Sequence, residues 1–122
     1  MKSLGATTWL IPDGYWNVYS TGKFPSHESV CVLNTGDADA KISMTLYFED
    51  RDPIVGFNAT CAAKRTHHVR MDKLTTAEGA VVPKGVPYAI LVESTVPVVI
   101  QYSRMDTTQA EMALMTAIAY HV

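Results

Sequence analysis

Apolar and polar residues alternate with a period of two along much of the chain, and this pattern predicts β-strands. Residues 40–49 are the clearest example, with an apolar side chain at every second position. The face expected to point inward carries Ile42, Met44, Leu46 and Phe48. A strand with one apolar and one polar face is typical of an antiparallel sheet. Residues 28–34 form another strand-like run, and the short turn between the two segments predicts a β-hairpin.

Turn residues such as Pro12-Asp13-Gly14 divide the chain into further short strands. The expected strands comprise residues 7–11, 28–34, 40–49, 55–61, 62–72, 88–93, 96–104 and a closing strand from residue 113. Ser94-Thr95 is expected to join two of them as a turn. About eight short strands predict an all-β fold, namely a single-domain antiparallel β-sandwich or barrel over residues 1–122.

The closing segment carries two conflicting signals. Residues 107–120 are rich in Ala, Met, Leu, Glu and Gln, and a Thr precedes them, so propensity alone predicts a capped helix. Thr116, Ile118 and Tyr120, however, alternate as they would in a strand that completes the sheet. We expect a strand from residue 113 onward.

A basic segment, residues 62–72, lies in the middle of the chain between two β-rich halves. In a strand, Val69 and Met71 would share the inward face, which leaves His68 and Arg70 side by side on the opposite face. Lys64 and Arg65 are interpreted as charges that protect a strand edge from aggregation. Nucleic-acid binding is the alternative interpretation of this segment, and we do not favour it, since no helix-turn-helix pattern or RNA-binding aromatic motif is present.

Composition and charge fit a soluble globular protein. The chain has 122 residues, 48% of them hydrophobic, with a formal net charge of −2. This charge gives no general attraction to nucleic acid or anionic lipid. The N-terminus lacks a secretory pattern and no apolar run is long enough to span a bilayer, so we expect a cytoplasmic protein. Cys31 and Cys61 are expected to be buried thiols in that compartment.

The sequence offers little for catalysis or for metal binding. It has no Gly-x-Ser-x-Gly, no His-Glu-x-x-His, no phosphate-binding glycine-rich loop and no Cys-x-x-Cys. His67 and His68 are adjacent, so in a strand they point to opposite faces and cannot chelate one metal ion. We therefore expect no enzyme activity, no cofactor and no metal site.

Several polar residues on otherwise apolar strands match a small polar ligand, either sugar-like or anionic. Arginines offer forked donors, amides both donate and accept, carboxylates accept, and an indole offers an apolar platform. The candidate ligand-binding residues are Trp9, His27, Glu28, Asn34, His68, Arg70, Gln101, Arg104 and Asp106. The alternative is that Arg70 or Arg104 pairs internally with Glu28 or Asp106 and ties strands together, and the residues alone leave both interpretations open.

A set of short motifs, ordered and spaced along nearly the whole chain, resembles the sensory rhodopsin transducer family. The motifs are Trp9 with Gly14-Tyr15, Ser26-His27-Glu28, Leu33-Asn34-Thr35-Gly36-Asp37 with Asp39-Ala40, Tyr47 with Asp50 and Pro53, Ala63-Lys64-Arg65-Thr66, His68-Val69-Arg70, Pro97 with Val99-Ile100-Gln101, Arg104-Met105-Asp106, Gln109-Ala110 and Ala119-Tyr120. The members of this family are small soluble bacterial proteins related to the transducer that partners a cyanobacterial sensory rhodopsin.

The resemblance implies a β-sandwich, a homotetramer and no known catalysis. It also implies a wider superfamily proposed to bind small molecules, sugars among them, with DNA contact suggested for the founding member. We therefore expect a non-enzymatic signalling protein that binds a small polar ligand in a homo-oligomer. The alternatives are a transducer that docks on the cytoplasmic side of a membrane rhodopsin, or a weak DNA-binding regulator.

Overall fold

The computed structural model describes residues 3–122, and its regular elements are eight strands and one short 3₁₀ turn. The strands are β1 (Ala6–Gly14), β2 (His27–Asn34), β3 (Ala40–Phe48), β4 (Ile54–Cys61), β5 (Arg65–Arg70), β6 (Tyr88–Asp106), β7 (Ala113–Ile118) and β8 (Tyr120–His121), and the turn is η1 (Met71–Lys73). The prediction of an all-β fold with about eight strands is confirmed.

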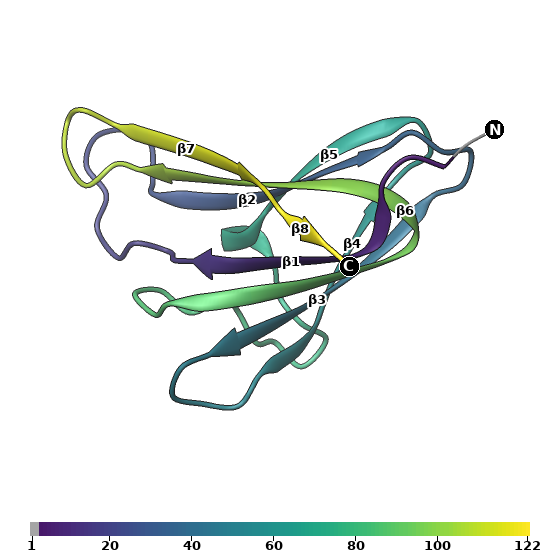
Figure 1. Cartoon of the computed structure of the whole chain (residues 1–122). Coiled ribbons are helices and arrows are strands. Elements are labelled where there is room, and N and C mark those ends of the chain that lie inside the picture. The colour runs from purple at the N-terminus through teal and green to yellow at the C-terminus, as the bar shows by residue number, and fades with distance from the viewer. Residues whose placement is uncertain (1–2) are drawn as a thin grey trace.

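The strands form two layers that share β6 (Figure 1). In one layer, here called sheet A, the order is β4-β3-β6-β1-β8. In the other, sheet B, β2 lies between β5 and β6, and β7 pairs with the other side of β6. All of these pairs are antiparallel. In Figure 1, β6 bends at the right-hand end and returns in the second layer.

The 19-residue strand β6 therefore replaces two predicted strands. Its residues up to Ser94 pair with β3 and β1, Val98 still pairs with Ala6 of β1, and the residues from Val99 onward pair with β2 and β7. The predicted turn at Ser94-Thr95 lies where the strand leaves one sheet for the other. The sequence signal there marks a bend within one strand.

The predicted hairpin between residues 28–34 and 40–49 is wrong. β2 pairs with β5 and β6, whereas β3 pairs with β4 and β6. The two strands lie in different sheets, and their apolar faces meet in one core that contains Val30, Val32, Ile42 and Met44. An inward face looks the same in sequence whether its neighbour lies beside the strand or across the core, and this explains the error.

The expected inward faces agree with the structure. Ile42, Met44 and Leu46 are buried, and Phe48 is partly buried against the core. Val69 and Met71 are also buried, while His68 on the opposite face is exposed. The basic strand is shorter than predicted, because residues 62–64 form a turn and η1 begins at Met71. The closing segment is a strand, as expected.

No helix among residues 3–122 is long and apolar enough to cross a membrane.

Candidate functional site

Glu28 lies near the start of β2 with only 1% of its surface exposed, and its carboxylate accepts three hydrogen bonds. Its Oε1 accepts a hydrogen bond from the Tyr88 hydroxyl at 2.5 Å. Its Oε2 accepts one from the Tyr15 backbone N–H at 2.6 Å and another from the Tyr102 hydroxyl. Tyr88 belongs to the half of β6 in sheet A and Tyr102 to the half in sheet B. One carboxylate thus links both sheets to the loop that follows β1.

The two tyrosines act as fixed donors in this network. Burial, followed by the neighbouring Glu28 charge, raises the pKa of the Tyr88 hydroxyl far above its ordinary value. The same two causes raise the pKa of the Tyr102 hydroxyl. Both groups therefore keep their protons at any physiological pH and donate to the carboxylate.

Arg104 extends the network toward the surface. Its Nε donates to the Tyr102 hydroxyl at 3.0 Å, and an Nη donates to the backbone O and the Oδ1 of Asp13, both at 3.2 Å. The guanidinium carbon also lies 5.6 Å from the centre of the Tyr102 ring. Arg104 therefore pairs internally, as the sequence-based alternative proposed, but its partners are Asp13 and Tyr102, neither of which had been expected.

Trp9 and Asn34 are buried and bonded within the chain. The Trp9 indole N–H donates to the carbonyls of Ala6 and Val98, each at 3.0 Å, and holds β1 against β6. The Asn34 amide has no exposed surface and joins two turns at the end of β2. Its Nδ2 donates to the carbonyls of Ala38, at 2.9 Å, and Cys61, at 3.1 Å.

Four predicted residues share the outer face of sheet B, the face turned away from the core. Strand register places His68, Cys31 and Gln101 in one row across β5, β2 and β6. The next row is Arg70, Ser29 and Ser103, and His27 follows beside Met105. The predicted neighbours His68 and Arg70 are thus joined on this face by His27 and Gln101.

Arg70 is held by Asp72 on this face. Its Nε and Nη2 donate to the two carboxylate oxygens at 2.9 and 2.8 Å. Burial alone would raise the pKa of Asp72, but the hydrogen bonds and charge of Arg70 outweigh burial and hold that pKa below its ordinary value. Asp106, the last predicted residue, ends β6 and accepts a hydrogen bond from the Thr108 N–H at 2.8 Å, which orders the next loop.

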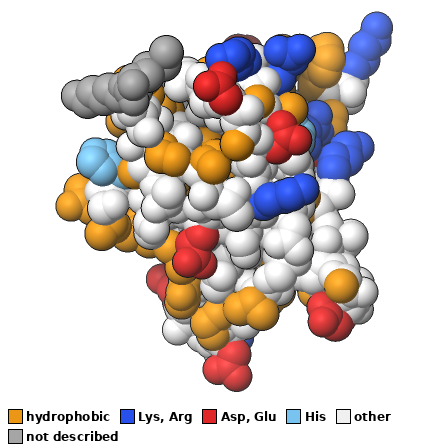
Figure 2. Space-filling view, turned by 90° about the vertical axis from the view of Figure 1, so that its right-hand side faces the viewer, with side chains coloured by type: hydrophobic (Ala, Val, Ile, Leu, Met, Phe, Trp, Pro, Cys, Tyr) orange, Lys and Arg blue, Asp and Glu red, His pale blue; other side chains and the backbone are white. Residues whose placement is uncertain are grey.

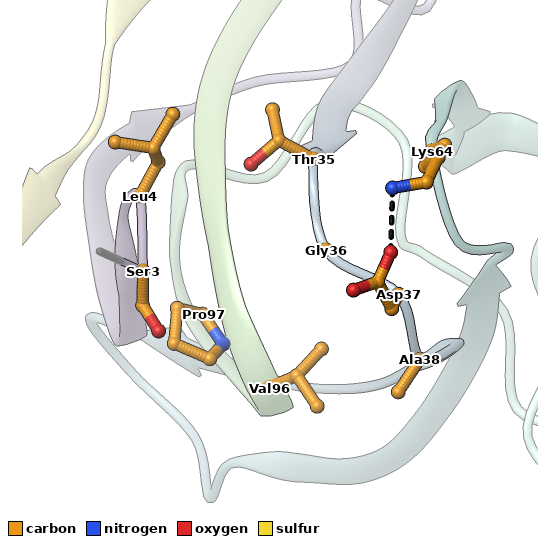
Figure 3. A pocket seen from close by; sticks show the side chains of 9 residues that line it. All are labelled: Ser3, Leu4, Thr35, Gly36, Asp37, Ala38, Lys64, Val96 and Pro97. Atoms are coloured by element: carbon orange, nitrogen blue, oxygen red, sulfur yellow. Dashed lines mark hydrogen bonds and ion pairs between the residues drawn. The ribbon is translucent and has the colours of Figure 1, made fainter. Parts of the chain in front are cut away.

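A pocket of about 330 Å³ lies at the other end of β2, where β6 crosses between the sheets (Figure 3). It is lined by Ser3, Leu4, Thr35, Gly36, Asp37, Ala38, Lys64, Val96 and Pro97. None of the nine predicted residues is among them. This end of the molecule faces the viewer in Figure 2, where Lys and Arg side chains gather in the upper part. The pocket has no local sequence signal, because its walls come from four separate segments.

Strand β7 presents an apolar, uncharged edge. All six of its residues are exposed, including Leu114 at 66% and Ile118 at 69%. In the part of the chain that the structure describes, β7 pairs with β6 alone. The opposite edge of sheet B, β5, carries Arg65, His67 and His68. Only one of the two edges is therefore protected by charged and polar side chains.

Metal binding finds no support in the arrangement of ligands. Across residues 3–122, no three or more His, Cys, Asp or Glu side chains gather in a way that could hold an ion. The His67 ring donates through Nδ1 to the Thr60 carbonyl at 2.8 Å, and His68 lies on the opposite face of β5.

Comparison with known proteins identifies the family. The sequence profile of the Anabaena sensory rhodopsin transducer family matches residues 4–121. The chain is similar to a solved structure titled "Crystal Structure of Thermotoga maritima 1070", with 43% identity and a TM-score of 0.86 over 97% of this chain and 96% of that one. It is also similar to the Anabaena sensory rhodopsin transducer, with 39% identity and a TM-score of 0.74 over 84% of this chain and 97% of that one. No curated protein matches the chain. The chain belongs to the Anabaena sensory rhodopsin transducer family.

Proposed function

We propose that this protein is a non-enzymatic signalling protein that works as a homo-oligomer and relays a signal by binding a partner. The solved relative named as a sensory rhodopsin transducer supports the signalling part of the proposal. The observation that carries the oligomeric part is the exposed edge of β7.

The exposed side chains on and beside β7 define an apolar surface. We call it the β7 surface, and its members are Met112, Leu114, Met115, Ile118 and Tyr120. A long, uncharged edge strand is an aggregation hazard in a monomer unless something covers it. Burying a side chain such as Leu114 or Ile118 would contribute up to about 1.5–3 kcal/mol each.

A second copy of the chain, docked on β7, explains both the open backbone edge of this strand and its exposed apolar side chains. A backbone edge with free N–H and C=O groups can pair with an identical edge about a two-fold axis. The apolar side chains on both faces of the strand would then pack against the partner copy. A homotetramer, the state that the family resemblance implies, would contain two such pairs.

The oligomer is tested by measuring molar mass with light scattering during size-exclusion chromatography. We expect the wild type to elute with a mass close to four times the 13.4 kDa of one chain. Ile118→Lys should shift the protein to smaller species, because a charge on the β7 surface disfavours association. Val55→Lys is the matched control, since Val55 is 67% exposed on β4, an edge of sheet A. A monomeric wild type, or equal masses for both variants and the wild type, would refute the proposal.

A small polar ligand, sugar-like or anionic, is the second proposed function, and the outer face of sheet B is its place. The observation that favours it is the shared position of His27, His68, Arg70 and Gln101 beside the hydroxyls of Ser29 and Ser103. In this proposal Trp9, Glu28, Asn34, Arg104 and Asp106 hold the strands that present the ligand-binding groups. Calorimetric titration with sugars and small anions tests it. Heat that disappears in Gln101→Ala supports the proposal, whereas no heat for any compound refutes it.

The proposed partner is a membrane rhodopsin, contacted on its cytoplasmic side. The solved relative named as a sensory rhodopsin transducer supports a rhodopsin as the partner. A cytoplasmic location agrees with two cysteines that are both free thiols. A pull-down with a rhodopsin cytoplasmic tail tests this part, and failure to retain the protein counts against it. DNA binding would instead give an affinity that falls steeply with salt, and we expect no such dependence.

A further inference from the structure

The pocket at the crossing of β6 is a candidate binding site separate from both the β7 surface and the outer face of sheet B. Its walls are the turn at residues 35–38, the Lys64 side chain, the Val96-Pro97 bend of β6 and the segment at Ser3 and Leu4. A volume of about 330 Å³ suits a ligand at the small end of the usual range. Figure 3 shows the charged residues on one side of the β6 ribbon and Leu4 on the other.

The polar wall of this pocket is held in place by hydrogen bonds within the chain. Asn34 donates to the carbonyls of Ala38 and Cys61 and accepts from the Gly36 N–H at 3.0 Å, so it joins the 35–38 turn to the end of β4. The Lys64 N–H donates to the Gly36 carbonyl at 3.1 Å. A binding site whose walls are already ordered avoids much of the entropic cost of binding.

The apolar wall is fixed as well. Gly5 has φ +98°, and a Cβ at this position would overlap the Val98 carbonyl oxygen. The N-terminal segment therefore lies directly against β6, just beyond the Val96-Pro97 bend. Leu4, Val96 and Pro97 contribute apolar side chains to the lining of the pocket.

The charges of the pocket come as one adjacent pair. Lys64 Nζ lies 2.5 Å from Asp37 Oδ1, and the two side chains are 65% and 86% exposed. Such an exposed pair adds little stability, so a ligand can separate its members at low cost. In Figure 3 the second oxygen of Asp37 is turned away from Lys64, and among residues 3–122 no side chain or backbone group donates to it. The hydrogen bond from Lys64, with the lysine charge, holds the pKa of Asp37 below its ordinary value.

The Lys64–Asp37 ion pair favours a ligand that carries one positive and one negative group. A ligand with one charge is attracted by one member and repelled by the other, so its net gain is small. A zwitterion can place its ammonium on the carboxylate and its carboxylate on the ammonium, and both contacts are charge-assisted. The hydroxyls of Thr35 and Ser3 offer further acceptors and donors at the same site.

We propose that this pocket binds a free α-amino acid with an apolar side chain. Asp37 and Thr35 receive its ammonium group, Lys64 receives its carboxylate, and its side chain packs against Leu4, Val96 and Pro97. This inference goes beyond the proposed function, since it concerns a different surface and a defined ligand class.

The first experiment is calorimetric titration of the full-length protein with L-valine and two analogues that each lack one charge. Isobutylamine keeps the ammonium and the branched apolar body, and isovalerate keeps the carboxylate and the same body. We expect L-valine to bind and each analogue to bind at least about tenfold more weakly. Erythritol, an uncharged polyol, is titrated in parallel, and preference for it over valine overturns the proposal, as does the absence of heat with valine.

Substitutions then test whether valine binding depends on the Lys64–Asp37 ion pair. Asp37→Asn and Lys64→Asn should each weaken valine binding by about tenfold or more. Asn is chosen as the replacement because the backbone at Lys64 has a φ of 55°, a conformation that Asn tolerates. Asp50→Asn is the matched control, since Asp50 forms an exposed ion pair with Arg51 at 2.9 Å outside the pocket. Equal affinity in Asp37→Asn and in the wild type would refute the assignment. The molar mass of each variant is measured as well, so a failure of the amino-acid site can be told apart from a failure of the proposed homo-oligomer.

Discussion

Replacing the Glu28 carboxylate by an amide is the sharpest test of the network that joins the two sheets. Glu28→Gln keeps the size of the side chain but removes its charge and one of its two acceptor oxygens. Three donors converge on the carboxylate, from Tyr15, Tyr88 and Tyr102. A hydrogen bond to a charged group contributes about 1.5–3 kcal/mol and a neutral one about 0.5–1.5 kcal/mol. The amide NH₂ is itself a donor, so it would face the O–H or N–H donor of a neighbouring group with no acceptor between them.

Losing about 1 kcal/mol at each of three hydrogen bonds predicts a loss of about 3 kcal/mol in the free energy of unfolding. Part of the cost of burying a charge is recovered, so we expect about 2–4 kcal/mol. Urea denaturation of the wild type and the variant, followed by tryptophan fluorescence and circular dichroism, measures this difference.

Two further variants show whether the loss comes from the network. Tyr88→Phe removes one donor, and in the wild type it should cost about 1–2 kcal/mol. In a Glu28→Gln background it should cost much less, because the charged partner is already gone. Additive losses, or a Glu28→Gln protein within about 0.5 kcal/mol of the wild type, would refute the idea that the carboxylate is a principal link between the sheets.

Three other predictions follow from single residues. Asn34→Ala should lower the free energy of unfolding by about 2–4 kcal/mol, because buried carbonyls of the 35–38 and 61–62 turns would lose their hydrogen-bond donor. Asn58→Ala, on the exposed face of β4, should have no measurable effect on that free energy. Gly5→Ala should reduce the thermal midpoint far more than Gly79→Ala, because both residues have positive φ but only Gly5 would meet the Val98 carbonyl; equal shifts would show that the contact is unimportant. The pKa of Asp72 is depressed in the folded state, so its contribution is complete above its ordinary value of 3.8 and is lost as the pH falls through the folded value. Acid titration should therefore show a shallower loss of stability below about pH 4 in Asp72→Asn than in the wild type, and identical profiles would contradict the pairing with Arg70.

The polar network illustrates what could and could not be predicted about the candidate site. Glu28 and Arg104 stand out in sequence as charges on apolar strands, and internal pairing was one of the two interpretations. Most of their actual partners are far away along the chain, however, since Tyr88 and Tyr102 lie 60 and 74 residues from Glu28, and Asp13 lies 91 residues from Arg104. The bond from Arg104 to Tyr102, two residues away, is the local one. No local pattern links such positions, so only the tertiary structure assigns them.

The sequence by itself determined which segments are strands and which of their faces are buried. Side-chain direction along a strand follows a period of two, so Ile42, Met44 and Val69 are assigned to the core without knowledge of any neighbour. The alternation of Thr116, Ile118 and Tyr120 also predicts the closing strand from residue 113 against its helix propensity, although all six residues of β7 are exposed. A buried strand partner outweighs the weak preference of Ala, Met and Leu for helix.

The tertiary structure decided how the strands pair and where surfaces are left open. The hairpin of residues 28–34 and 40–49 looked natural because a short turn joins them, yet they face each other across the core. The bend of β6 makes this arrangement possible, since one strand then serves both sheets. The same bend, with the 35–38 turn and Lys64, forms the 330 Å³ pocket. Both features depend on contacts between distant segments, and a local hydrophobic pattern carries no information about such contacts.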